Sequence, residues 1–322
     1  MIRAFVHRDG SLVETDAGAG LDAAVWIDLS DPAPEEVERV RRDLGMPLPE
    51  REVIEEIETS SRLYHEGDTS LMTAVLPGGT GEDGPRFRPV TFALAPGRLV
   101  TLRFHDPKPF RTYPTRAAQV PVGCASPEGV LLGLLYDVVD RLADLLERVG
   151  QDLDAISDRV FAASDDREGA TRDHRDALKT LGRLGDFVAR FRNALLSVER
   201  LLGFLAQTLR QREMDADARA LVKTLSRDVA ALTTHTDFLG QKITLLLDAT
   251  LGFITIEQAG ITKIFSVVAF VMLPPTLIAS IYGMNIEYMP ELDWPYAYPA
   301  VLAAMVVSAV VPYLYFKWKG WL

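Results

Sequence analysis

Residues 282–294, YGMNIEYMPELDW, carry the side chains of this sequence whose chemistry is easiest to name. The stretch contains no lysine or arginine, but it holds one amide and three acids: Asn285, Glu287, Glu291 and Asp293. Carboxylates without neighbouring bases create a negative potential that raises the local concentration of cations. We therefore expect the three acids to recruit cations; the alternative is that they only keep a loop hydrated.

Two runs without charged residues flank this stretch. Residues 264–286 and 294–316 each contain 23 residues with no acidic or basic side chain. A helix of about 20 apolar residues crosses the hydrocarbon core of a bilayer. Core helices of soluble domains usually carry a polar face, and these runs have no charged residue to provide one. Both are therefore predicted to be transmembrane helices rather than buried core helices.

Charges near the two runs predict the orientation in the membrane. Lys263 precedes the first run, and Lys317 and Lys319 follow the second, whereas the loop between the runs has no lysine or arginine. By the positive-inside rule, both termini are cytoplasmic and the loop is outside.

The start of the chain has no long apolar segment of the kind found in a signal peptide. A lone cysteine, Cys124, fits a reducing compartment. We expect about 260 residues to stay in the cytosol before the first span.

Composition excludes several classes of function. The 322 residues have a net charge of −11, so no basic surface is expected for a nucleic acid, and no nucleic-acid partner is predicted. The sequence contains no HExxH motif, no nucleophile–base pattern and only five scattered histidines, so we predict that the protein is not an enzyme. The predicted partners are further copies of the chain and the lipid bilayer, and no other protein partner is evident.

The spacing of apolar residues predicts the helices and strands of the rest of the chain. Up to about residue 125 the chain mixes strand and helix patterns, including a hairpin around Asp9 and Gly10 and a buried strand at 24–29. From Ser126 the pattern is helical, and no proline interrupts it between Ala216 and Pro274, which allows roughly 85 to 90 Å of helix. The predicted fold is an α/β cytosolic N-terminal domain, a long-helix stalk and two C-terminal transmembrane helices. The predicted regions are 1–125 (α/β domain), 126–213 (long cytosolic helices), 214–263 (stalk helix continuous with the first span), 264–284 (first span), 285–294 (external loop), 295–316 (second span) and 317–322 (cytosolic basic tail).

A stripe of small and hydroxyl-bearing residues follows one side of this long helix. Its members, spaced alternately four and three residues apart, are Asp248, Gly252, Thr255, Ala259, Thr262, Ser266, Ala269, Leu273, Thr276 and Ser280. Such a stripe indicates either close packing between helices or the wall of a pore. The pore is favoured because the stripe starts at a carboxylate, ends near Asn285 and continues below the bilayer. One span per subunit cannot enclose a pore, so the chain must form an oligomer.

Several motifs together resemble the CorA family of magnesium transport proteins, in its magnesium-transporting branch. They are the Gly283-Met284-Asn285 triplet, MPELDW at 289–294, the span KIFSVVAFVMLPPTLIASIYGMN and the tail YFKWKGWL. AVWIDL and GFITIEQ extend the resemblance more weakly over most of the chain. The resemblance implies a homopentameric funnel in a bacterial inner or plasma membrane, with the first span lining the pore and the second forming an outer ring.

The implied function is Mg²⁺ influx, with Co²⁺ as a second candidate ion. The resemblance places a ring of Asn285 side chains at the outer entrance, on a turn shaped by Gly283 and Met284. Mg²⁺ gives up its water reluctantly, and carboxamide oxygens accept hydrogen bonds from the bound waters without removing them. Below this ring, the predicted pore-lining residues are Asp248, Thr255, Thr262, Ser266, Leu273, Thr276 and Ser280.

The resemblance also implies closure when cytosolic Mg²⁺ binds acids between subunits. Asp228, Asp237 and Asp248 on the stalk are candidates, with partners among the acids at 55–58 and 137–158; the alternative is an ordinary solvated or ion-paired helix face. Lys317 and Lys319 would ring the cytosolic mouth, or serve only to set the topology.

One departure from the family pattern lies below the membrane. The chain has EQAG at 257–260, where related sequences tend to have an asparagine at the position of Ala259. The pore is therefore expected to be less polar at this level.

Two other functions fit the same architecture. One is transport of Zn²⁺ or Ni²⁺, against which the MPEL loop and the lack of a His/Cys cluster near the spans argue. The other is a non-conducting, membrane-anchored sensor, against which the polar stripe and the GMN triplet argue.

Overall fold

The structure is a computed structural model that describes residues 1–15, 21–55, 62–81, 84–120, 122–162, 170–212, 216–284, 289–290 and 294–321. The chain divides into two compact units. The first contains Met1–Asp158 and Lys179–Leu246, and the second contains Arg159–Leu178 and Leu247–Leu322.

A seven-stranded mixed sheet organises the first unit, in the order β2-β1-β3-β7-β6-β5-β4. Its strands are β1 (Ile2–Arg8), β2 (Ser11–Thr15), β3 (Trp26–Ser30), β4 (Leu63–Glu66), β5 (Thr69–Gly81), β6 (Gly84–Ala95) and β7 (Arg98–Arg103). The predicted hairpin is present, because Asp9 and Gly10 both have positive φ, 49° and 77°, as a tight two-residue hairpin turn requires. β3 and β7 pair in parallel at the centre of the sheet, and the other described pairs are antiparallel.

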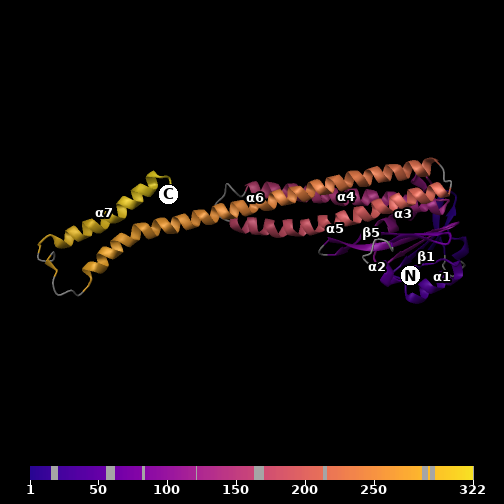
Figure 1. The fold of residues 1–322 in the computed structure, drawn as a ribbon, viewed down its shortest axis with the longest axis horizontal. Helices are drawn as coiled ribbons and strands as arrows, with labels where there is room; N and C mark the ends of the chain where they lie inside the picture. The colour runs from indigo at the N-terminus through magenta and orange to yellow at the C-terminus, as the bar shows by residue number, and fades with distance from the viewer. Residues whose placement is uncertain are drawn as a thin grey trace. The chain divides into compact units, whose positions relative to one another are not determined.

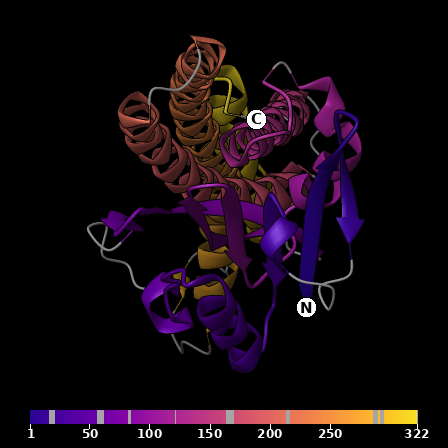
Figure 2. The same ribbon diagram turned by 90° about the vertical axis from the view of Figure 1, so that its right-hand side faces the viewer.

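Helices cover both faces of this sheet (Figure 2). On one face, α1 (Pro34–Leu44) and α2 (Arg51–Glu55) bury Val40 and Ile54 against aliphatic side chains of β3, β6 and β7. On the other face, Trp26 and Phe92 contact Phe110 of α3 (Pro109–Arg116). The single-turn helices η1 (Leu21–Ala23) and η3 (Ala117–Gln119) complete the connections.

Two long helices follow α3 in the chain. They are α4 (Pro127–Ala162) and α5 (Ala170–Gln211). α5 packs on the sheet through the rings of Phe187 and Phe191, which lie 5.4 and 6.2 Å from the ring of Phe87 on β6. α4 packs closely against α3, since a Cβ atom at Gly133 would lie only 2.4 Å from the ring of Tyr113.

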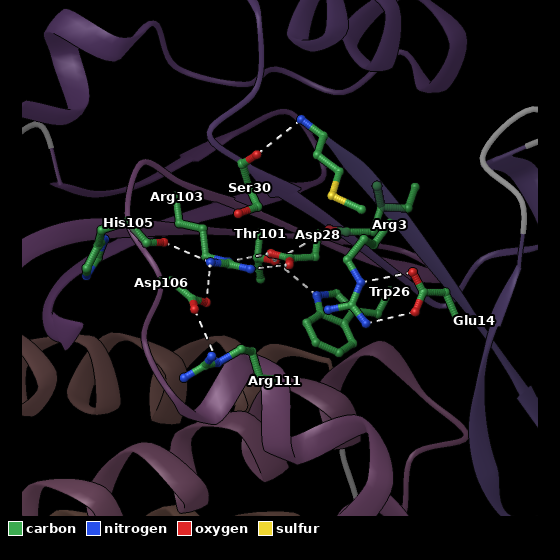
Figure 3. A network of polar contacts seen from close by, with 12 residues as sticks. Arg3, Glu14, Trp26, Asp28, Ser30, Thr101, Arg103, His105, Asp106 and Arg111 are labelled. Carbon is green, nitrogen blue, oxygen red and sulfur yellow. Dashed lines mark hydrogen bonds and ion pairs between the residues drawn. The ribbon is translucent and has the colours of Figure 1, made fainter. Parts of the chain in front are cut away.

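A buried polar network crosses the centre of the sheet (Figure 3). Asp28 on β3 accepts hydrogen bonds from Nε and Nη2 of Arg103 at 3.1 and 2.9 Å, and from the hydroxyl of Thr101 at 2.9 Å. Arg103 also donates to the carbonyl of His105 and to Asp106. The network therefore joins two parallel strands to the loop that leads into α3.

The last two helices carry the apolar runs. α6 (Ala216–Tyr282) is one helix of 67 residues and is labelled in Figure 1; at 1.5 Å per residue it is about 100 Å long. It continues through Pro274 and Pro275. α7 (Ala297–Trp318) follows, and both helices are long and apolar enough to cross a membrane. The structure thus has the predicted α/β region, the long helix and two apolar C-terminal helices.

Candidate ion pathway

The predicted polar stripe forms an exposed line of hydrogen-bond acceptors along α6. Four of its hydroxyl groups donate to the backbone carbonyl one turn earlier, at O···O distances of 2.7 to 3.0 Å. The four residues are Thr255, Thr262, Ser266 and Thr276. Because each hydroxyl proton is used within the helix, the oxygen lone pairs remain available to the outside. Such a row can accept hydrogen bonds from the water shell of a cation.

α7 packs beside the stripe and leaves it uncovered. Val267 is buried, and the ring of Phe270 lies 6.0 Å from that of Phe316 on α7. Positions 267 and 270 follow the stripe positions 266 and 269 by one residue, which is about 100° around a helix. All stripe members are exposed except Ser266, which is half-buried. The stripe is thus free to face water or further subunits.

The C-terminal part of the stripe borders a hollow of about 460 Å³. Its lining consists of Ala269, Met272, Leu273, Thr276, Leu277 and Ser280, four of which belong to the stripe. Pro274 and Pro275 have no N–H, so the carbonyls of residues 270 and 271 receive no helical amide hydrogen bond. Figure 1 shows α6 bent toward its C-terminal end. Loss of these helical hydrogen bonds at the two prolines accounts for a bend in this part of α6.

Gly283 directly follows the last residue of α6. Its N–H donates to the carbonyl of Ala279 at 2.9 Å, and a Cβ atom on Gly283 would lie 3.0 Å from that same oxygen. Met284 is exposed beyond it. Because glycine has no Cβ atom, the backbone at position 283 can lie close to the carbonyl of Ala279 in the last turn of α6.

The predicted ring and recruitment residues lie outside the described part of the chain. These residues are Asn285, Glu287, Glu291 and Asp293. Their roles stay predictions.

The stalk acids differ in their surroundings. Asp228 and Asp248 are exposed. Asp237 accepts a hydrogen bond from Nε of Arg192 on α5 at 2.7 Å, and both side chains are about half exposed. This is the ion-paired arrangement that we gave as the alternative. Within the described ranges, no group of three or more His, Cys, Asp or Glu side chains is arranged to hold a metal ion.

Asp137 on α4 differs from the other acids at 137–158, because its residue is only 5% exposed. Nη1 of Arg116 lies 3.7 Å from its Oδ1, and its buried Oδ2 has no hydrogen-bond partner among the described residues. Burial raises the pKa of the Asp137 carboxyl, and Arg116 partly opposes this shift. A cavity of about 140 Å³ next to it is also lined by Asp140 and Asp144. Spacing along a helix predicts the shared face of these acids, but not the burial of one of them.

The basic tail contains an interaction that sequence reasoning missed. Lys317 and Lys319 are exposed, as expected for a solvated end of α7. Lys263 was predicted only to set the topology, yet its ammonium contacts the carbonyl of Gly320 and the ring of Trp321. No local sequence signal reveals a contact between residues 57 positions apart.

Comparisons with known proteins find relatives over nearly the whole chain. The family model for CorA-like Mg²⁺ transporter proteins matches residues 22–318. The magnesium transport protein CorA of Escherichia coli strain K12 is 38% identical over 325 residues, covering 100% of both chains. The same protein of Pectobacterium atrosepticum is 36% identical over 312 residues, covering 97% of this chain and 96% of the relative. The fold is similar to the complete structure of the CorA magnesium transporter from Methanocaldococcus jannaschii, with a TM-score of 0.79 at 20% identity, covering 100% of this chain and 99% of that one.

Proposed function

Because the chain belongs to the CorA family of membrane Mg²⁺ transporters, which are not enzymes, we propose that it carries Mg²⁺ through a pore lined by α6 of identical subunits. The observation that carries this proposal is the row of outward-facing hydroxyl acceptors that α7 leaves uncovered. A single α6 cannot enclose a path, so the chain must assemble with further copies of itself. We take the number of subunits, five, from the resemblance to the CorA family. Co²⁺ is the second ion proposed.

The ion passes through the pathway with its water shell still bound. Mg²⁺ dehydrates reluctantly, so oxygen acceptors that bind its water protons hold it more weakly than direct carboxylate ligands would. Asn285 provides the first such ring at the outer mouth, and Glu287, Glu291 and Asp293 raise the cation concentration there. Thr276, Ser266 and Thr262 continue the acceptors inward, and Asp248 attracts the ion toward the cytosolic side.

The proposed orientation places the GMN loop outside a bacterial inner membrane and both termini in the cytoplasm. Lys263, Lys317 and Lys319 supply the positive charge of the cytoplasmic side. In this orientation a negative-inside potential drives Mg²⁺ inward.

Closure by cytosolic Mg²⁺ is proposed to use acids from neighbouring subunits. Asp228 and Asp248 are exposed and available for a partner copy. Asp237 must first release Arg192. Asp137 offers an unsatisfied buried oxygen that a cation could neutralise. Loss of Mg²⁺ would leave like charges facing one another and loosen the closed assembly.

The test is Mg²⁺ entry into liposomes that contain the purified protein, a trapped Mg²⁺ indicator and a negative-inside potential. We expect flux with the wild type, its loss in Asn285→Ala, and unchanged flux in the control Asn193→Ala, an exposed asparagine on α5. Equal flux in wild type and Asn285→Ala would remove the role of the Asn285 ring. Absence of Mg²⁺ flux with entry of Zn²⁺ or Ni²⁺ would indicate another transported ion, and absence of flux for all ions would favour a sensor.

A further inference from the structure

The C-terminal end of α7 turns back on itself through a glycine. Gly320 has a φ of 68°, a left-handed conformation that a glycine adopts at little cost. Its N–H donates to the carbonyl of Lys317 at 3.1 Å, and the N–H of Trp321 donates to the carbonyl of Phe316 at 2.9 Å. This pair of hydrogen bonds is a Schellman motif. The turn stacks the ring of Trp321 on that of Phe316, with centroids 5.4 Å apart.

Lys263 of α6 is bound by this turn. Its Nζ donates to the carbonyl oxygen of Gly320 at 3.3 Å and lies 5.7 Å from the centroid of the Trp321 ring. A cation within about 6 Å of a tryptophan face is attracted by the ring quadrupole. The carbonyl and the ring together therefore hold the ammonium group on the side of α6 that faces α7.

The direction of this ammonium matters for the ion path. Lys263 is the one acidic or basic residue among positions 258–281. It follows Thr262 of the stripe by a single residue, which is about 100° around the helix. A lysine has a long flexible stem, so its charge can reach toward the stripe when nothing holds it. A positive charge there would repel a divalent cation twice as strongly as a monovalent one.

We propose that Gly320 and Trp321 form a latch that keeps the Lys263 ammonium away from the stripe and so prevents it from opposing cation passage. Both are positioning residues, since they act through Lys263 and not on the ion. The inference rests on the proposed transport function. If Trp321 acts through Lys263, removing the charge of Lys263 must restore the flux that is lost when Trp321 is replaced. A purely structural role of Trp321 would not give this compensation.

The test compares Mg²⁺ flux in the liposome assay for a set of variants. Trp321→Leu removes the ring that holds Lys263, and Trp318→Leu is the matched control, because Trp318 is 82% exposed. We expect Trp321→Leu to lower the flux by about tenfold, and Trp318→Leu to leave it unchanged. Lys263→Gln combined with Trp321→Leu should restore the flux toward that of the wild type. The deficit of Trp321→Leu should shrink as ionic strength rises, since salt screens the released charge.

The outcomes separate this inference from the proposed function. Each variant is first shown to elute as the same oligomer as the wild type, which excludes misfolding. Wild-type flux with an unchanged Trp321→Leu variant would overturn the latch alone. A reduced flux that Lys263→Gln does not restore would also overturn it and assign Trp321 a packing role. Absence of wild-type flux would overturn both the transport function and the inference.

Discussion

Asp28 and Arg103 form an ion pair inside the sheet, with Nη2 of the arginine 2.9 Å from Oδ2 of the aspartate. Their side chains are 0% and 3% exposed, and they come from parallel strands 75 residues apart in the sequence. Every oxygen of the carboxylate accepts a hydrogen bond from the protein. The pair thus connects the centre of the sheet to the loop before α3 without leaving a charge unmatched.

Replacing one partner of this pair should strongly destabilise the first unit. Asp28→Asn removes the carboxylate that accepts from Nε and Nη2 of the buried Arg103 and leaves Asp106 as its remaining counter-charge, a loss of about 3–5 kcal/mol in the free energy of unfolding. The control is Asp43→Asn, which disrupts an exposed ion pair with Arg39 and should cost below about 1 kcal/mol. Thermal unfolding of the detergent-solubilised protein measures both, and equal midpoints for the two variants would contradict the prediction.

Because of Asp137, the free energy of unfolding should fall as the pH rises above the pKa of an ordinary aspartate. Burial raises the pKa of this carboxyl in the folded state, so the folded protein keeps a proton that the unfolded chain has already lost. Its stabilising contribution is present below the unfolded pKa, about 4, and is lost as the pH rises through the folded value.

Asp137→Asn should therefore flatten the dependence of the unfolding midpoint on pH just above about pH 4. The measurement is a series of thermal unfolding curves in the presence of a Mg²⁺ chelator. Asp140→Asn, an exposed change of the same charge on the same helix, serves as the control. An unaltered pH dependence in Asp137→Asn would show that the buried carboxyl does not titrate in this range.

Ala259→Asn should add polarity to the stripe at the position where we expect related sequences to carry an asparagine. Ala259 is exposed, so a carboxamide there adds one acceptor per subunit. Tighter holding of the hydrated ion should lower the Mg²⁺ concentration for half-maximal flux and reduce the maximal rate. Ala230→Asn, an exposed position of α6 outside the stripe, is the matched control. If both variants transport like the wild type, position 259 does not contact the ion.

Neutralising the outer acids should weaken recruitment without blocking passage. The triple change Glu287→Gln, Glu291→Gln and Asp293→Asn is expected to raise the Mg²⁺ concentration for half-maximal flux several-fold at low salt. The difference should nearly vanish at high ionic strength, where the Debye length is only a few ångströms.

The control for this change removes the same net charge from the first unit, through Glu35→Gln, Glu38→Gln and Glu52→Gln. An effect of equal size in this control would mean that total charge, and not the loop, attracts the ion.

Much of the architecture could be predicted because it depends on short-range periodicity. The charge-free runs predict two apolar helices, and α6 and α7 carry them. Asp9 and Gly10 predict a hairpin because few residue pairs accept two positive φ angles. The four-three spacing from Asp248 predicts a stripe, since it follows directly from the helical repeat.

Tertiary structure alone decided which polar groups have partners. The sequence does not show that Arg192 holds Asp237, that Asp28 meets Arg103, or that Lys263 reaches Gly320. The members of each pair lie 45, 75 and 57 residues apart, so their contact depends on how whole elements pack. Burial of Asp137 is likewise a result of packing, because this carboxylate of α4 lies beside Arg116 of α3, whereas helical spacing alone would assign it to a solvated face. The sequence by itself determined the elements and their faces, and the packing of distant segments determined which charges are paired, buried or left exposed.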